Sequence, residues 1–143
     1  MAGRVLGVDV GARRVGLAIS DASGTLARPL DTIAVSSDAD AVDRVAQRVD
    51  ALARDDDGLA AIVVGMPAAL DGTKTPASVR VAAFVAALAA RTPLPIAVED
   101  ERLTSIEAES RLAIQERDWK KRKEKLDAAA AAIILQDYLD RER

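Results

Sequence analysis

The sequence predicts an α/β fold in which a mixed sheet is flanked by helices. Three segments rich in β-forming residues follow one another within residues 4–35, which is typical of an antiparallel meander. Helical and strand patterns then alternate from residue 37 onward, which is typical of parallel strands connected by helices. The 143 residues contain no internal repeat and no long linker, so 1–143 is expected to be one domain.

The predicted meander begins with a strand at 4–10, where β-branched residues are frequent. Residues 11–14 are expected to form a tight turn, and 15–20 return as a second strand. A third strand is expected within 25–35. Pro29 has no backbone N–H to donate, so this strand should lie at an edge or contain a bulge.

Two helix–strand pairs are expected next. Ser37 or Asp38 can cap a first helix that ends near Arg54. Its apolar residues recur at helical spacing and are Val42, Val45, Val49 and Leu52. A second helix is predicted by the stripe of Val81, Phe84, Val85 and Leu88. Short apolar strands at 60–65 and 96–99 follow the first and the second helix.

The C-terminal third is expected to be helical. One helix opens at Thr104 or Ser105 and extends to about Gln115, and a last helix spans about 126–139. The stretch 116–125 between them is charged throughout, and we expect it to be an exposed segment before the last helix.

The composition excludes several kinds of active site. The chain has no cysteine and no histidine, so thiol nucleophiles, cysteine- or histidine-bound zinc and a Ser-His-Asp triad are excluded. Acid–base or metal chemistry must therefore come from carboxylates, lysines or hydroxyls. Carboxylate oxygens favour hard cations such as Mg²⁺ or Mn²⁺.

Charge and hydropathy limit the expected surroundings. The net charge is −3, so binding to nucleic acid requires a local basic patch. There is no apolar run long enough to span a membrane, and the chain opens on strand-like residues rather than a signal peptide. We expect a cytoplasmic protein without a membrane partner.

Asp9 is the first candidate for chemistry. It lies near the end of an apolar strand, where a carboxylate is costly to bury unless something compensates its charge. Gly7, Gly11 and Gly16 are close to it in the predicted hairpin and permit close approach of a ligand or backbone. A strand-end aspartate can equally cap the turn through hydrogen bonds. On this residue alone both interpretations remain open.

A second group of acids ends the strand predicted at 96–99. Glu99, Asp100 and Glu101 stand in succession, and Arg102 follows. Strand ends in α/β sheets are frequent ligand sites, although alternation sends neighbouring side chains to opposite faces. The simpler interpretation is that the acids favour the positive N-terminus of the next helix, but three exceed what that role requires.

Asp127 is the third candidate. Its neighbours at i+3, i+4 and i+7 are Ala130, Ala131 and Ile134, so it lies on an apolar helix face beside small residues. An acid near the start of a helix commonly interacts with the helix dipole instead, and for Asp127 in isolation that is the simpler hypothesis.

Together the three acids favour a divalent-metal site. Carboxylates brought together raise one another's pKa unless a cation lies between them, and a metal ion removes both the repulsion and the burial cost. Two such ions about 4 Å apart can activate water and stabilise the leaving oxygen of a phosphoryl displacement. This chemistry requires neither histidine nor cysteine.

Basic residues are placed where they can bind phosphates near these acids. They are Arg13, Arg14, Lys74, Arg102, Lys120, Lys121, Arg122 and Lys123. Such binding would weaken with salt. For the lysine-rich cluster alone, an ordinary solvated charged loop is the more common interpretation.

Four motifs in order resemble the YqgF/RuvX family. The first runs from Leu6 to Ala18 (LGVDVGARRVGLA), and the second is Val63–Pro67 (VVGMP) followed by Asp71-Gly72-Thr73. The third is Asp100–Ser105 (DERLTS), and the fourth joins Lys121-Arg122-Lys123 to Asp127–Ala130 (DAAA). The matches span nearly the whole chain. The family often has threonine at the position of Ser105, and serine keeps the hydroxyl group.

This resemblance implies a ribonuclease H-like fold with a five-stranded mixed sheet, three strands antiparallel and two parallel. It implies a hydrolase, a metal-dependent nuclease that matures the 5′ end of pre-16S rRNA in ribosome biogenesis or resolves Holliday junctions in DNA recombination. Carried over by motif, Asp9, Glu101 and Asp127 are the catalytic, metal-holding acids, with Glu101 chosen over the adjacent Asp100. The implied cofactor is Mg²⁺ or Mn²⁺. The implied partners are RNA, pre-rRNA or branched DNA, with the ribosome or a pre-ribosomal particle, for a monomer or a homodimer.

Two other functions are weighed against the nuclease. Asp-x-Gly in a hairpin, as at Asp9 and Gly11, also holds phosphate in actin-like ATPases, but these usually need two related domains. A noncatalytic RNA-binding ribosome-assembly factor could keep the same fold, and the presence of all three acids argues against it.

Overall fold

The computed structural model of the chain describes residues 3–67, 74–100 and 119–142, and the side chains of 119–124 lie outside that description. Five strands are present in this part: β1 (Arg4–Val10), β2 (Arg14–Ser20), β3 (Ala27–Ala34), β4 (Leu59–Met66) and β5 (Ile96–Asp100). Three helices accompany them: α1 (Asp38–Arg54), α2 (Pro76–Ala89) and α4 (Trp119–Glu142). The helix expected at 104–115 falls outside the described residues.

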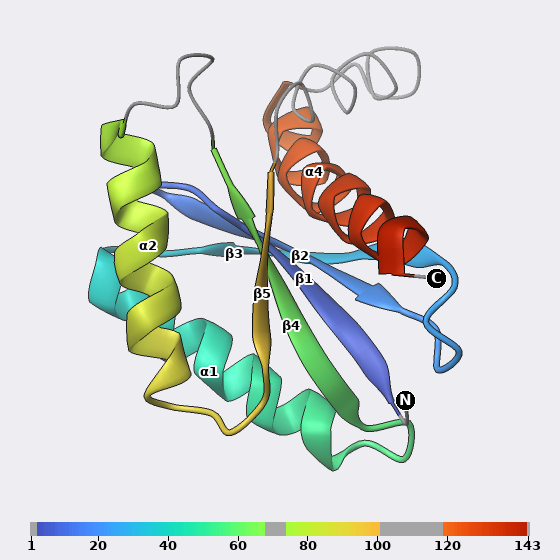
Figure 1. Cartoon of the computed structure of the whole chain (residues 1–143). Coiled ribbons are helices and arrows are strands. Elements are labelled where there is room, and N and C mark those ends of the chain that lie inside the picture. Colours follow the sequence, from blue (N-terminus) through green and yellow to red (C-terminus); the bar gives the residue numbers. More distant parts are fainter. Residues whose placement is uncertain (1–2, 68–73, 101–118, 143) are drawn as a thin grey trace.

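The strands form one mixed sheet in the order β3-β2-β1-β4-β5. β1 pairs with β2, and β2 with β3, in antiparallel fashion, whereas β1–β4 and β4–β5 are parallel. Helices α1 and α2 cover one face of this sheet and α4 crosses the other (Figure 1). The predicted fold class, with three antiparallel strands followed by two parallel ones, is confirmed.

Alternation along the strands supplies a core for each face. Leu6 and Val8 of β1 pack with α1 and α2 in the larger core. Val5, on the opposite face, packs with apolar residues of α4. Gly7 faces α4 as well, because a Cβ there would lie 2.8 Å from Cβ of Leu135. The helix therefore lies close to the sheet where glycine removes the side chain.

Most element ends agree with the sequence to within two residues, and local capping explains them. The Ser37 side chain accepts a hydrogen bond from the Asp40 backbone N–H at 3.0 Å and begins α1. Thr75 and Ser78 form a reciprocal capping box at the start of α2. Pro29 lies in the edge strand β3, beside a register shift between Leu17 and Ala18, as expected.

The start of the last helix was predicted wrongly. α4 begins at Trp119 rather than near 126, so residues 119–125 are helical and not a charged segment before the helix. Lys, Arg and Glu are good helix formers despite their polarity, and this propensity extends the helix N-terminally.

Among the helices described, none combines the length and apolar character needed to cross a bilayer.

Candidate active site

The candidate site lies at the edge of the sheet where the parallel strands end. β1, β4 and β5 run in the same direction, so Asp9, Met66 and Asp100 lie toward the same edge. The antiparallel β2 begins there, at Arg14. Such carboxyl-terminal edges are frequent ligand sites in α/β sheets.

Asp9 lies between two glycine positions on the face covered by α4. Its direct partner on β2 is Gly16. On the other side Val8 pairs with Val64, so the next positions along these parallel strands are Asp9 and Gly65. Because Val8 packs with α1 and α2, its neighbour Asp9 faces α4. The Asp9 carboxylate is therefore flanked by positions without side chains.

Gly16 sets the close approach of α4. A Cβ on Gly16 would lie only 2.0 Å from the backbone carbonyl oxygen of Asp127 and 2.4 Å from its carbonyl carbon. Directly opposed residues of antiparallel strands have Cα atoms about 4.5–5.5 Å apart. Since Gly16 opposes Asp9 and touches the backbone of Asp127, the fold brings these two acids into one neighbourhood.

The position of Asp127 within α4 excludes a dipole role at the N-terminus. The helix begins at Trp119, so Asp127 lies beyond its second turn, where the N-terminal dipole effect has faded. Its neighbours Ala130, Ala131 and Ile134 are buried, as the helical spacing predicted. The Asp127 side chain itself is 25% exposed.

Arg14 is a basic residue in contact with Asp127. Its Nε lies 2.6 Å from Oδ2 of Asp127. The turn before it is closed by a hydrogen bond of 2.9 Å from the Gly11 N–H to the Arg14 carbonyl oxygen. A cleft of ≈ 420 Å³ opens beside the pair and is lined by Gly11, Ala12, Arg13, Arg14 and Asp127. This cleft carries two guanidinium groups beside a carboxylate.

Alternation separates the acids at the end of β5. Glu99 is buried and its carboxylate pairs with the Arg141 side chain from the end of α4, so it lies on the α4 face. Asp100 falls on the other face, with Ile96, which packs against the α1–α2 core. Glu101 and Arg102 lie outside the described residues. The charge of Glu99 is compensated by an ion pair that the sequence did not reveal.

Of the remaining predicted basic residues, Lys74 is the one whose side chain is described, and it does not line the cleft. Lys74 lines a separate cavity of ≈ 290 Å³ with Met66, Ser78, Val79 and Ala82, on the α2 side of the sheet. Lys120, Lys121, Arg122 and Lys123 belong to the first two turns of α4 by their backbone, and nothing is described of their side chains.

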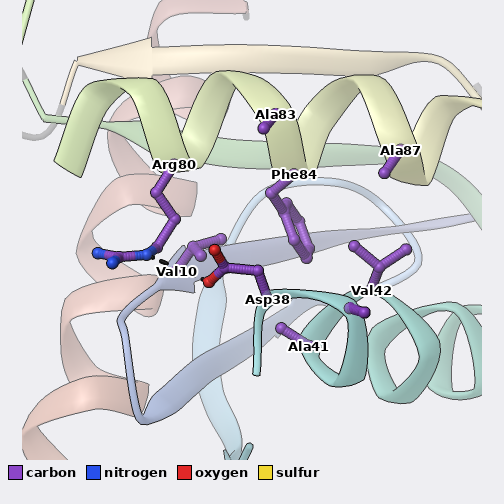
Figure 2. A pocket seen from close by; sticks show the side chains of 9 residues that line it. Val10, Asp38, Ala41, Val42, Arg80, Ala83, Phe84 and Ala87 are labelled. Atoms are coloured by element: carbon purple, nitrogen blue, oxygen red, sulfur yellow. Dashed lines mark hydrogen bonds and ion pairs between the residues drawn. The ribbon is translucent and has the colours of Figure 1, made fainter. Parts of the chain in front are cut away.

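A second cavity lies between α1 and α2 on the opposite face, with a volume of ≈ 180 Å³. Its lining is mostly apolar, and Phe84 projects from α2 toward α1 (Figure 2). Arg80 and Asp38 form an ion pair of 3.2 Å at its side. Among the described residues that line this cavity, the single carboxylate is already paired to arginine, so they lack the donors of a metal site.

Within the described ranges no group of three metal-binding side chains is present. The described part therefore supplies two of the three predicted acids, Asp9 and Asp127. The sequence predicted close approach of a ligand or backbone at Gly16 but not that this backbone is that of Asp127, and it did not reveal the contact between Arg14 and Asp127. The available signal was the glycine itself, one strand away from Asp9 in a hairpin with a short turn.

Comparison with solved structures supports the fold. The Thermus thermophilus RuvC in complex with a Holliday junction substrate superposes with a TM-score of 0.55 over 98% of this chain and 95% of RuvC. The two chains are 18% identical, so this likeness concerns the fold alone.

Curated relatives match over the full length. A protein of Thermoanaerobacter pseudethanolicus named "Putative pre-16S rRNA nuclease" is 40% identical over 98% of both chains. A protein of the same name from Chloroflexus aggregans is 42% identical over 97% of this chain and 94% of its own. The family model described as "RuvX: Holliday junction resolvase" matches residues 3–141. The chain therefore belongs to the RuvX family, a family of nucleases.

Proposed function

We propose that this protein is a metal-dependent nuclease that hydrolyses phosphodiester bonds with Asp9, Glu101 and Asp127. The observation that carries the proposal is the close packing of the α4 backbone against Gly16. This contact brings Asp127 beside Asp9 at the carboxyl edge of the sheet. Two carboxylates from distant parts of the chain, next to arginines and an open cleft, suit the binding of a phosphodiester.

The donors fit a hard divalent cation. Asp9 and Asp127 offer carboxylate oxygens, and the chain has no histidine or cysteine to favour softer metals. Glu101 follows the last residue of β5 and would complete the set. When bound, Mg²⁺ or Mn²⁺ would lower the pKa of a water molecule and stabilise the leaving oxygen.

Alternation supports Glu101 rather than Asp100 as the third acid. Asp100 falls on the face of the α1–α2 core, whereas Asp9 faces α4. Asp100 is therefore the less suitable of the two adjacent acids. Under this proposal Arg13 and Arg14 hold the backbone phosphates at the cleft, which Asp127 also lines.

Pre-rRNA is the substrate we propose, in cytoplasmic ribosome biogenesis. The relatives at about 40% identity carry the name of a pre-16S rRNA nuclease and match over the whole chain. We further propose that 1–143 acts as a single domain. A monomer suits RNA processing, whereas symmetric cutting of a four-way junction is most simply done by a two-fold dimer.

The test is metal-dependent cleavage by the wild type and by Asp9→Asn. Each is incubated with single-stranded RNA, a pre-16S rRNA fragment that includes the 5′ end, and a four-way DNA junction, in Mn²⁺, Mg²⁺ or EDTA. We expect metal-dependent cutting of the pre-rRNA fragment, lost in Asp9→Asn while binding persists. Cleavage retained by Asp9→Asn would refute the assignment.

A matched pair tests the choice of the third acid. Glu101→Gln should abolish cleavage, and Asp100→Asn, one residue away, should retain it because that side chain faces the other core. The reverse result would make Asp100 the ligand. If no substrate is cut while RNA is still bound, the protein is the noncatalytic assembly factor instead.

A further inference from the structure

The Arg14–Asp127 ion pair joins two side chains to which the proposed function gives different partners. Under that proposal Asp127 ligates a divalent ion and Arg14 contacts a backbone phosphate. Nε of Arg14 lies 2.6 Å from Oδ2 of Asp127, the length of a charge-assisted hydrogen bond. The guanidinium therefore occupies one of the two carboxylate oxygens that could bind a metal ion.

The two partners differ in their freedom to move. Asp127 is fixed by its own backbone, which packs on Gly16. Arg14 has a long side chain that is 35% exposed and borders a cleft of ≈ 420 Å³. If the pair separates, the arginine has space to turn into the cleft, whereas the aspartate remains in place.

We propose that Arg14 is an exchangeable counter-ion of Asp127. The guanidinium would leave the carboxylate when a divalent ion is bound, turn toward the cleft and bind a phosphate of the nucleic acid there. The inference rests on the proposed function, because it concerns the same site. The Asp127 carboxylate faces a cation before and after the exchange, and Arg14 gains a phosphate once nucleic acid is bound.

Coupling between the two ligands follows from this exchange. Nucleic acid that holds Arg14 in the cleft removes the competitor for Asp127 and so strengthens metal binding. By linkage, the metal ion strengthens binding of the nucleic acid by the same factor. Without substrate, Arg14 would thus neutralise the charge of Asp127. With nucleic acid bound, it would favour binding of the metal ion.

The first test measures Mn²⁺ binding directly, without nucleic acid, from the electron paramagnetic resonance signal of the free ion. Arg14→Gln is compared with Arg13→Gln, which removes the same charge from the neighbouring, exposed position. We expect Arg14→Gln to bind Mn²⁺ at least about tenfold more tightly than Arg13→Gln, the effect of losing one competing hydrogen bond between charged groups. Circular dichroism verifies folding, and Arg14→Met serves as a second variant.

The second test repeats the Mn²⁺ titration with a short phosphorothioate RNA that resists hydrolysis. In the wild type the RNA should tighten Mn²⁺ binding, and in Arg14→Gln this tightening should be lost. A residue with only a structural role would leave the coupling unchanged.

The outcomes separate this inference from the function it rests on. If the wild type binds Mn²⁺ but Arg14→Gln binds it no more tightly than Arg13→Gln, the counter-ion role is refuted and the nuclease proposal stands. If the wild type binds no divalent ion at all, the metal assignment fails and this inference fails with it.

Discussion

Replacing Gly16 by alanine would place a methyl carbon 2.0 Å from the carbonyl oxygen of Asp127. Side-chain Cβ atoms essentially never approach other atoms within 3.0 Å, so this contact must lengthen by at least 1 Å. The obstructing atom belongs to a helix backbone, which cannot turn away as a side chain could. The helix must therefore withdraw from the sheet and carry Asp127 with it.

Two magnitudes follow for Gly16→Ala. Overpacking of this kind costs about 1–3 kcal/mol of folding free energy. A displacement of about 1 Å between catalytic groups can cost about a hundredfold in rate. We therefore expect a protein that still folds at low temperature but cleaves RNA about a hundredfold more slowly than the wild type.

Gly7→Ala is the matched control because α4 also packs closely against Gly7. The nearest atoms there are Cβ of Leu135 at 2.8 Å and the Ala131 carbonyl oxygen at 3.0 Å, a milder clash farther along the helix. Urea denaturation measures stability, and single-turnover cleavage of the pre-rRNA fragment measures rate. Wild-type cleavage by folded Gly16→Ala would refute the claim that this contact positions Asp127.

Three further predictions concern charge. Arg141→Ala leaves the buried Glu99 carboxylate without its ion-pair partner, and the loss in urea stability should fall below the about 3–5 kcal/mol of a fully buried pair, because the Arg141 side chain is 59% exposed. The double change with Glu99→Val should recover much of the loss, and equal losses in both proteins would contradict this account. The Thr25 backbone N–H donates a hydrogen bond to the Asp21 carboxylate and holds the pKa of that carboxyl below its usual value. The stability that the ionised Asp21 contributes is therefore fully present above the unfolded-state pKa and is lost as the pH falls through the folded-state pKa. Thermal melting should show that the melting temperature of Asp21→Asn falls less steeply with decreasing pH than that of the wild type. Identical pH profiles would contradict a stabilising role for the Asp21 carboxylate. Neutralising Lys120–Lys123 should weaken binding to all RNA sequences alike and reduce the slope of log affinity against log salt. An unaltered slope would mean that these residues do not bind phosphates.

Local sequence patterns determined much of this fold. Period-two burial, turn residues and caps at Ser37 and Thr75 act over a few residues, so the strands and the first two helices could be predicted closely. The start of α4 could not, because charge suggested exposure while helix propensity extended the helix to Trp119. Polarity indicates where a residue faces but does not decide its backbone conformation.

For the site, the sequence by itself determined the chemistry that is available: carboxylates without histidine or cysteine, near arginines, in motifs that resemble one family. It did not determine which groups touch. The pairing of Arg14 with Asp127, the seating of α4 on Gly16 and the burial of Glu99 against Arg141 were decided only by the tertiary structure. Each of these contacts joins segments far apart in the chain, and their distance depends on how closely a helix packs on the sheet, which no local pattern encodes.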